Sequence, residues 1–281
     1  MKSGSVNKFW TYLLLSIAAI PMLAPFLWML ATSLKDSSGA LAIPPQWIPR
    51  PFVPKNYSDA AEKFRFGLFT FNSLKISTLS TIGQLLSCSL AAYAFARMKF
   101  RGNNVIFFIL LATMMVPYQV TMIPVFYVIR LLGWADSHNA LIIPSFFGGT
   151  FGGAAFGTFL LRQFFETIPR EMEDAAAIDG AGKFRIYWNI FLPLSKPALA
   201  TLGLFVFMGS WNDLLQPVIY LSSYDKMTLT VGLASLQSSQ EMFQYNILMA
   251  GAALSIIPIL ILFIFTQKYF VKGFVLSGIK G

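Results

Sequence analysis

The stretch EDAAAIDGAGKFRIYWNIFLP, residues 173–193, concentrates charge in a chain that otherwise avoids it. Of the 33 acidic and basic residues in this 281-residue protein, ten lie between Arg162 and Lys196. Apolar runs long enough to cross a membrane stand on both sides of this segment. A dense polar segment between two such runs is typical of a loop that meets a soluble partner.

The composition places the rest of the chain in a membrane. Hydrophobic residues make up 56% and charged residues 12%, whereas soluble domains contain about 25% charged residues. The apolar runs do not alternate over about 10 residues as the strands of a membrane barrel do. The sequence therefore predicts an all-α polytopic membrane protein that forms a single domain over 1–281. Six transmembrane helices of about 20 residues or more are expected, at 10–34, 70–96, 103–128, 139–162, 196–221 and 243–267.

Basic residues between the helices predict the orientation of the chain. Three follow the second helix, between 97 and 101, and three follow the sixth, between 268 and 280. Both regions and the N-terminus are therefore expected to be cytoplasmic. The loop 34–66 is then external, although it carries five basic residues against three acidic ones. The first apolar run is too long for a secretory signal, and Pro25 after Ala24 is a poor cleavage context, so we expect an uncleaved helix.

Several function classes lack the residues they need. Cys88 lies within the second predicted helix and His138 in an external loop, so neither a disulfide framework nor a metal cluster is expected. The chain has no G-x-x-x-x-G-K-[ST] phosphate loop, so any ATP used must bind another subunit. The net charge of +9 reflects membrane topology, and no basic groove suggests nucleic acid.

The charged segment predicts two short helices joined by a tight turn. Pro169 suits a first helical turn, and Glu171, Glu173 and Asp174 put negative charge where the helix dipole favours it. Gly180 is suited to a left-handed conformation that would end this helix. In the second helix an apolar stripe is expected at i, i+3, i+4 and i+7, formed by Phe184, Tyr187, Trp188 and Phe191. From periodicity alone, an amphipathic hairpin lying on the bilayer surface remains an alternative.

The spacing of the segment resembles a known motif. The inner-membrane subunits of binding-protein-dependent ABC importers carry a loop with the pattern EAA, three residues, Gly, nine residues, Ile, any residue, Leu-Pro. Here it reads Asp174-Ala175-Ala176, then Gly180, Ile190 and Leu192-Pro193, with every spacing kept. Asp174 in place of Glu is the one departure, and Glu173 beside it retains a longer carboxylate. The external IPPQWIPRPFVPKNY, the WNDLLQPVIYL of the fifth helix and the terminal QKYFVKGFVLSGIKG are similar to the second permease of maltose-type carbohydrate importers.

This resemblance implies a type I importer permease fold, with a coupling loop at 163–195 between the fourth and fifth helices. The implied partners are a second permease that completes a heterodimer, an ABC ATPase dimer that binds ATP and Mg²⁺, a periplasmic or lipid-anchored solute-binding protein, a sugar and the lipid bilayer. The chain would then be a non-enzymatic transporter subunit of a bacterial or archaeal cell (inner) membrane. The residues expected to dock on the ATPase are Glu173, Asp174, Ala175, Ala176, Asp179 and Gly180. Those expected to anchor the loop to the fifth helix are Ile190, Leu192 and Pro193.

The sequence gives fewer indications of which residues line the solute path. Asp213 is a carboxylate within a predicted membrane helix, and such groups normally face a cavity or a partner; with Asn212 and Trp211 it is a candidate for the path. A helix cap or a structural ion pair explains Asp213 equally well. Three alternatives to a sugar permease remain: a permease for another solute such as glycerol phosphate or a compatible solute, a self-contained channel or secondary transporter, and a membrane enzyme. No buried proton relay or broken inverted repeat favours the second, and no catalytic constellation favours the third.

Overall fold

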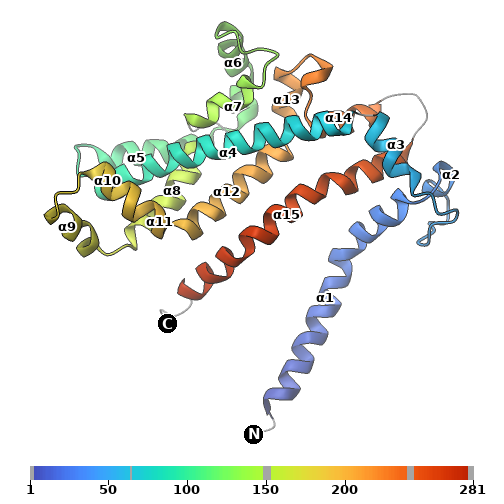
Figure 1. Ribbon diagram of the computed structural model, residues 1–281, viewed down its shortest axis with the longest axis horizontal. Helices are drawn as coiled ribbons and strands as arrows, with labels where there is room; N and C mark the ends of the chain where they lie inside the picture. Colours follow the sequence, from blue (N-terminus) through green and yellow to red (C-terminus); the bar gives the residue numbers. More distant parts are fainter. Residues whose placement is uncertain (1–2, 64, 148–152, 239–243, 278–281) are drawn as a thin grey trace. The chain divides into compact units, whose positions relative to one another are not determined.

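The computed structural model describes residues 3–63, 65–147, 153–238 and 244–277, and within these ranges the regular structure is helical. The chain forms two compact units. Unit 1 contains Met1–Gly67 and Gly232–Ile257, and unit 2 contains Leu68–Val231 and Pro258–Gly281 (Figure 1). The charged segment and the elements that hold it belong to unit 2.

The elements follow one another in a simple order. The longer helices are α1 (Ser3–Ser33), α3 (Lys55–Lys63), α4 (Phe66–Arg97), α5 (Asn103–Ala112), α6 (Tyr118–Leu131), α7 (Asn139–Phe146), α8 (Gly153–Glu166), α9 (Arg170–Ile178), α12 (Lys196–Trp211), α14 (Leu229–Ser238) and α15 (Tyr245–Ser277). The shorter ones are α2 (Ser37–Ala40), η1 (Thr113–Met115), α10 (Lys183–Ile186), the π-helix η2 (Tyr187–Phe191), α11 (Leu192–Leu194), α13 (Leu215–Tyr220) and η3 (Tyr224–Lys226).

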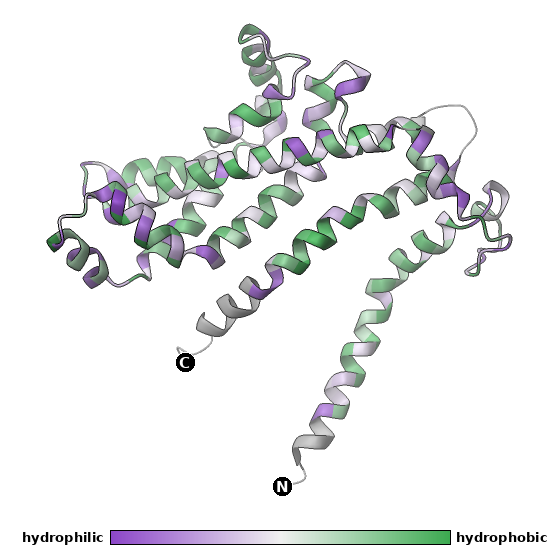
Figure 2. Cartoon of the chain, in the orientation of Figure 1, coloured by the Kyte–Doolittle hydropathy of each residue, from purple (hydrophilic) through white to green (hydrophobic). Residues whose placement is uncertain are grey.

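Three helices in the described part of the chain are long and apolar enough to span a membrane, at Lys8–Ser33, Phe66–Arg97 and Tyr245–Lys268. They coincide with the first, second and sixth predicted helices, and Figure 2 shows the hydrophobic character of each. Two bent pairs raise the number of candidate spans to five. The fourth predicted helix, 139–162, corresponds to α7 and α8, which flank the undescribed residues 148–152. The count of six stays a prediction.

The third predicted helix, 103–128, is not continuous. It divides into α5 with η1 and α6, which meet at 101°. Val116 is extended at φ −85° and ψ 111°, as the residue before a proline tends to be, and Pro117 has no N–H to continue the helical hydrogen bonds. The fifth predicted helix, 196–221, likewise ends as α12 at Trp211 and resumes as α13 at Leu215.

Unit 1 is held by two buried asparagines. The side-chain amide of Asn56 in α3 donates to the carbonyl oxygens of Ser33 and Lys35, at 2.8 and 2.7 Å. The amide of Asn246 in α15 donates to the same Lys35 carbonyl and to Oδ1 of Asn56. These bonds tie the end of α1 to α3 and α15. The hydrophobic window of α1 itself has no part buried within the chain.

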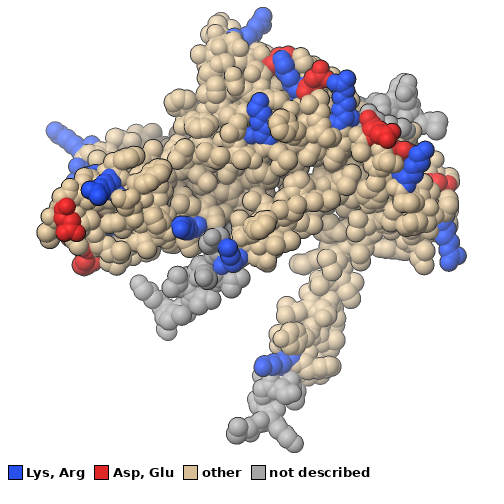
Figure 3. All heavy atoms as spheres, in the orientation of Figure 1, with Lys and Arg blue, Asp and Glu red and all other residues tan. Residues whose placement is uncertain are grey.

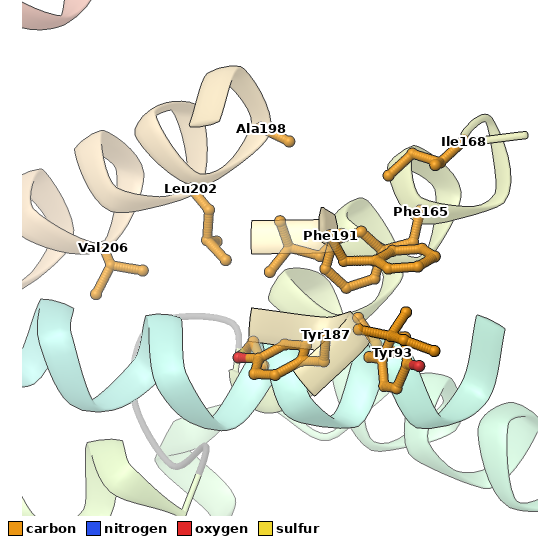
Figure 4. Close-up of a cluster of buried hydrophobic side chains, with 12 residues drawn as sticks. Tyr93, Phe165, Ile168, Tyr187, Phe191, Ala198, Leu202 and Val206 are labelled. Atoms are coloured by element: carbon orange, nitrogen blue, oxygen red, sulfur yellow. The ribbon is translucent and has the colours of Figure 1, made fainter. Parts of the chain in front are cut away.

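The main core of unit 2 lies where α4, α8 and α12 meet (Figure 4). Gly157 allows α8 to lie close to α4 and α12. A Cβ at this position would lie 2.7 Å from Sγ of Cys88 in α4 and 3.1 Å from a methyl carbon of Leu202 in α12. Leu161 and Phe165 continue the contact along α8. This three-helix junction is the base on which the charged segment rests.

Elsewhere in unit 2, hydrogen bonds and an ion pair join the loop that contains Asp136 to the loop that contains Ser222 and Ser223. Asp136, in the left-handed conformation at φ 53°, accepts hydrogen bonds from the backbone N–H groups of Ser222 and Ser223 and from the Ser223 hydroxyl. Its carboxylate also pairs with Nζ of Lys226 at 2.9 Å. The hydrogen bonds from Ser223, the Lys226 ammonium and the Ser222 N–H hold the pKa of Asp136 below its usual value.

We predict that Asp136→Asn lowers the thermal stability of the protein in a pH-dependent way. Asn tolerates the left-handed backbone but loses the pairing with Lys226. Because the folded pKa is depressed, the carboxylate stabilises the fold above its unfolded pKa of about 3.9 and loses this effect as pH falls through the folded pKa. The difference in Tm between wild type and variant, measured in detergent, should therefore be largest near neutral pH and narrow below about pH 4. Glu62→Gln, which removes an exposed carboxylate of α3, is the control. A difference that does not change with pH contradicts the assignment.

Candidate functional site

The charged hairpin, residues 170–194, begins with α9. Pro169 stands just before the helix at φ −57° and ψ 139°, one residue earlier than the predicted first turn. Its missing N–H costs nothing at that place, and Glu171 and Glu173 lie in the first turn, next to the positive end of the helix dipole. The sequence therefore specifies where this helix starts.

A glycine turn ends α9, as predicted. Gly180 has φ +78°, and its N–H donates to the Ala177 carbonyl at 3.1 Å, while that of Ala181 donates to Ala176 at 2.9 Å. This pair of bonds is the Schellman motif, which satisfies carbonyl groups left open at a helix end. Ala176 and Ala181 also pack against the core of unit 2, so the turn is fixed on its inner side.

The second arm differs from its predicted pattern. Tyr187 and Phe191 are 1% and 0% exposed, whereas Phe184 and Trp188 are 67% and 53% exposed, so the expected stripe is wrong for half its members. Five residues of this arm form a π-helix, Tyr187–Phe191. A π-helix has more residues per turn than an α-helix, which shifts side chains around the axis. The inward side consists of Ile186, Tyr187, Ile190 and Phe191.

Aromatic contacts fix this arm to the three-helix junction. The Tyr187 ring lies 5.4 Å from that of Tyr93 in α4, and the Phe191 ring lies 5.4 Å from that of Phe165 in α8 (Figure 4). The hydroxyls of Tyr187 and Ser89 are 2.8 Å apart. The second arm of the hairpin is therefore packed against the helices of unit 2.

Two basic side chains add polar links. The guanidinium of Arg97, at the end of α4, donates to the carbonyl oxygens of Phe165 and Ile168, and so joins α4 to the chain that enters the hairpin. Within the hairpin, Nζ of Lys183 pairs with the buried carboxylate of Glu173 at 2.8 Å. This ion pair closes the two arms on each other.

The outer side of α9 is apolar and uncovered. Met172, Ala175 and Ile178 recur every three residues and are exposed, Ile178 to 86%. An exposed apolar helix face next to charged residues is a candidate protein interaction surface. Met172 and Ile178 were not among the predicted site residues, although their spacing in the sequence indicates one helical face.

The predicted site residues fall into two groups. Asp174, Ala175, Asp179 and Gly180 are exposed, but Glu173 is buried in the ion pair and Ala176 packs inward. Of the predicted anchors, Ile190 and Leu192 pack against the core whereas Pro193 is exposed. The structure thus brings all of them together in one hairpin and gives them different surroundings.

The candidates for the solute path lie between α12 and α13. Asp213 Oδ1 accepts the backbone N–H of Leu215, the first residue of α13, at 3.0 Å. Asn212 is exposed and donates to the Met208 carbonyl, while Trp211 is buried and its ring stacks on that of Phe207. Within the described residues, no three His, Cys, Asp or Glu side chains gather as a metal site would require. Cys88 is buried in the core.

Comparisons with known proteins agree with this architecture. The family described as "Binding-protein-dependent transport system inner membrane component" matches residues 83–275. The chain is 37% identical over 210 residues to the arabinooligosaccharides transport system permease of Halalkalibacterium halodurans, covering 75% of this chain and 73% of the relative. It is 33% identical over 271 residues to the sn-glycerol-3-phosphate transport system permease of Yersinia enterocolitica, covering 94% of each. The crystal structure of a bacterial ABC transporter involved in the import of the acidic polysaccharide alginate contains a chain with a TM-score of 0.80 and 26% identity, covering 96% of this chain and 98% of that one.

We predict that Gly180→Val loosens the hairpin whereas Gly182→Val does not. Both glycines have open space around the position of a Cβ, but Gly180 has φ +78° and Gly182 has φ −70°. A β-branched residue strains only the former, by about 1–2 kcal/mol. Limited trypsin digestion at Lys183 and Arg185 should accelerate in the first variant alone. Equal digestion of the two variants contradicts a conformational role for Gly180.

Proposed function

Because the chain belongs to the family of binding-protein-dependent transport system inner membrane components, we propose that it is one permease subunit of an ATP-driven importer that takes up a sugar. It forms half of the translocation pathway, and the charged hairpin receives the movement of an ATPase. The observation that carries this proposal is a hairpin with the importer spacing that is packed firmly on one side and presents an uncovered apolar helix face on the other.

The packing of the second arm of the hairpin supports a role in transmitting movement. Tyr187 and Phe191 sit in the junction of α4, α8 and α12, so a force applied to α9 reaches three helices at once. Packed elements of this kind move as rigid bodies, because interiors are too dense to deform continuously. ATP energy then drives the pathway without any chemistry in this chain, which has no enzymatic role of its own.

We assign docking to the exposed part of the hairpin. Met172, Ala175 and Ile178 provide apolar contact, and Asp174 and Asp179 provide charge next to it, with Gly180 setting the end of the helix. Glu173 and Ala176 hold α9 in place from the inside. Ile190 and Leu192 anchor the second arm, and Pro193 leads it into α12.

The remaining parts of the proposal concern the whole assembly. The chain acts as a single domain over 1–281, with a coupling loop at 163–195 and both termini in the cytoplasm of a bacterial or archaeal cell. A second, different permease completes the pathway, an ATPase dimer binds ATP and Mg²⁺, and a periplasmic or lipid-anchored binding protein delivers the solute. Asn212, Asp213 and Trp211 lie near the break between α12 and α13, and of the three Asn212 is the most accessible to a solute.

The proposal that the solute is a sugar is based on the relatives of this chain. The same relatives also support a second class of solute. The arabinooligosaccharide permease and the alginate importer favour an oligosaccharide. The glycerol-3-phosphate permease aligns over a larger share of the chain and supports a phosphorylated small solute as the alternative. The proposed role of the chain as a permease subunit is the same for either solute.

We predict that the double variant Met172→Ser and Ile178→Ser assembles poorly with the ATPase. Each apolar side chain that becomes buried contributes about 1.5–3 kcal/mol, so the loss of two should greatly reduce ATPase recovery when the membrane complex is purified through a tag on this chain. Leu131→Ser, which removes an exposed apolar side chain of α6, is the control. Full ATPase recovery with the hairpin variant contradicts the docking face.

Solute identity is tested in proteoliposomes that contain both permeases and the ATPase. We expect the cognate binding protein loaded with an oligosaccharide to stimulate ATP hydrolysis. In the same proteoliposomes, we expect the Gly180→Val variant to keep its ATPase subunits but to lose solute uptake. If only a binding protein loaded with glycerol phosphate stimulates ATP hydrolysis, the solute is the alternative one. Absence of stimulation by any loaded binding protein overturns the importer assignment.

A further inference from the structure

A basic cavity lies beside the charged hairpin in unit 2. It has a volume of about 980 Å³, and its wall is built from the end of α4, the connection to α5, the last turns of α8 and the inner side of the hairpin. Six cationic and three acidic side chains line it, which leaves an excess of three positive charges. The cations are Arg97, Lys99, Arg101, Arg162, Arg170 and Lys183, and the acids are Glu166, Glu173 and Asp174.

Half of these cations are already engaged. Arg97 donates to two carbonyl groups, Arg162 pairs with Glu166 at 2.9 Å, and Lys183 pairs with Glu173. Among the described residues, Lys99, Arg101 and Arg170 are not paired with a carboxylate and are exposed. Figure 3 shows basic side chains at the end of unit 2 that carries α9 and α10, at the left of the view. Unpaired cations that line one cavity repel each other and attract an anion.

The surroundings of the cavity indicate which anion. Its first residues, Phe95 to Arg97, form the last turn of α4, which is a candidate membrane span. Met98 and Phe100 are exposed among the basic residues of the rim. From the cavity α5 continues with a row of exposed apolar side chains formed by Val105, Ile106, Phe108 and Ile109. The site therefore combines positive charge at the end of a membrane span with an adjoining apolar surface, which is the pattern of a lipid headgroup site.

We propose that this cavity binds the headgroup of an anionic phospholipid, with its acyl chains along α5. The phosphodiester is held by Lys99 and Arg101, which follow α4, and by Arg170 of α9. Because Arg170, Glu173 and Asp174 belong to α9, the lipid links the hairpin to the end of α4. The site goes beyond the proposed transport role and does not depend on which solute is carried.

An acidic peptide of the ATPase is the competing occupant. Arg170 and Glu173 line the cavity from a side of α9 that differs from the outer face of Met172, Ala175 and Ile178, and the exposed Asp174 borders both. A soluble subunit docked on the outer face would therefore leave the cavity uncovered. The apolar rim also suits acyl chains better than an acidic peptide, and these two observations favour the lipid.

The test is native mass spectrometry of the detergent-purified importer complex with added phosphatidylglycerol, phosphatidylcholine or inorganic phosphate. We expect the complex to retain phosphatidylglycerol selectively. The double variant Lys99→Gln and Arg101→Gln should weaken retention about 10- to 30-fold, and Arg170→Gln in α9 should weaken it independently. Arg185→Gln with Lys196→Gln is the matched control, because it removes the same charge from exposed residues outside the cavity. Unchanged Tm in detergent shows that the variants are folded.

Three outcomes overturn the proposal. Equal loss of phosphatidylglycerol in the cavity and control variants indicates general surface charge. Retention of inorganic phosphate to the same extent as phosphatidylglycerol indicates a soluble anion. Lipid retained by the permeases alone but released when the ATPase is docked assigns the cavity to the ATPase interface. A complex that lacks transport but still retains the lipid contradicts the proposed function and leaves the lipid site intact.

Discussion

The insertion of Tyr187 and Phe191 into the junction of α4, α8 and α12 is the contact on which the rest of the hairpin depends. The two rings are buried against Tyr93 and Phe165, and a fully buried aromatic side chain contributes roughly 1.5–3 kcal/mol or more. Gly157 makes the junction narrow enough for these contacts, because any side chain there would meet Cys88 and Leu202. Without this base the hairpin would be attached only through its two chain connections.

The first arm has little stability of its own. A nine-residue helix is marginal in water, and α9 buries only a small part of its surface. Its order comes from neighbours: the acidic first turn, the Schellman turn at Gly180, and the ion pair between Glu173 and Lys183. Met172, Ala175 and Ile178 are exposed, so a partner that docked on them would bury apolar surface and stabilise α9 at the same time.

The sequence predicts a large part of this arrangement and fails at identifiable places. Gly180 and Pro169 have strong local preferences, so the turn and the helix start follow from residue type alone. The break in the third helix is also a local effect, because Pro117 has no N–H to continue the helical hydrogen bonds. The stripe in the second arm failed for a different reason. An α-helical period of 3.6 cannot anticipate a π-helix, and whether Phe184 or Ile186 faces inward depends on helices far away in the sequence. The inward position of Glu173 depends in the same way on Lys183, ten residues later.

The charges of the hairpin therefore serve different neighbours, although in the sequence they form one cluster. Glu173 and Lys183 bind each other and fix the two arms. Arg170 and Asp174 face the cavity beside the end of α4, and Asp179 is exposed next to the glycine turn. An isolated surface charge contributes little to stability, so the unpaired ones are retained at low cost and remain available to partners. The segment thus has one side packed on the helices, one side apolar and exposed, and one side basic, and under our two proposals the second would contact the ATPase and the third an anionic lipid. Since α9 is short and its turn is fixed, these three contacts cannot move independently, and a shift at one must displace the other two.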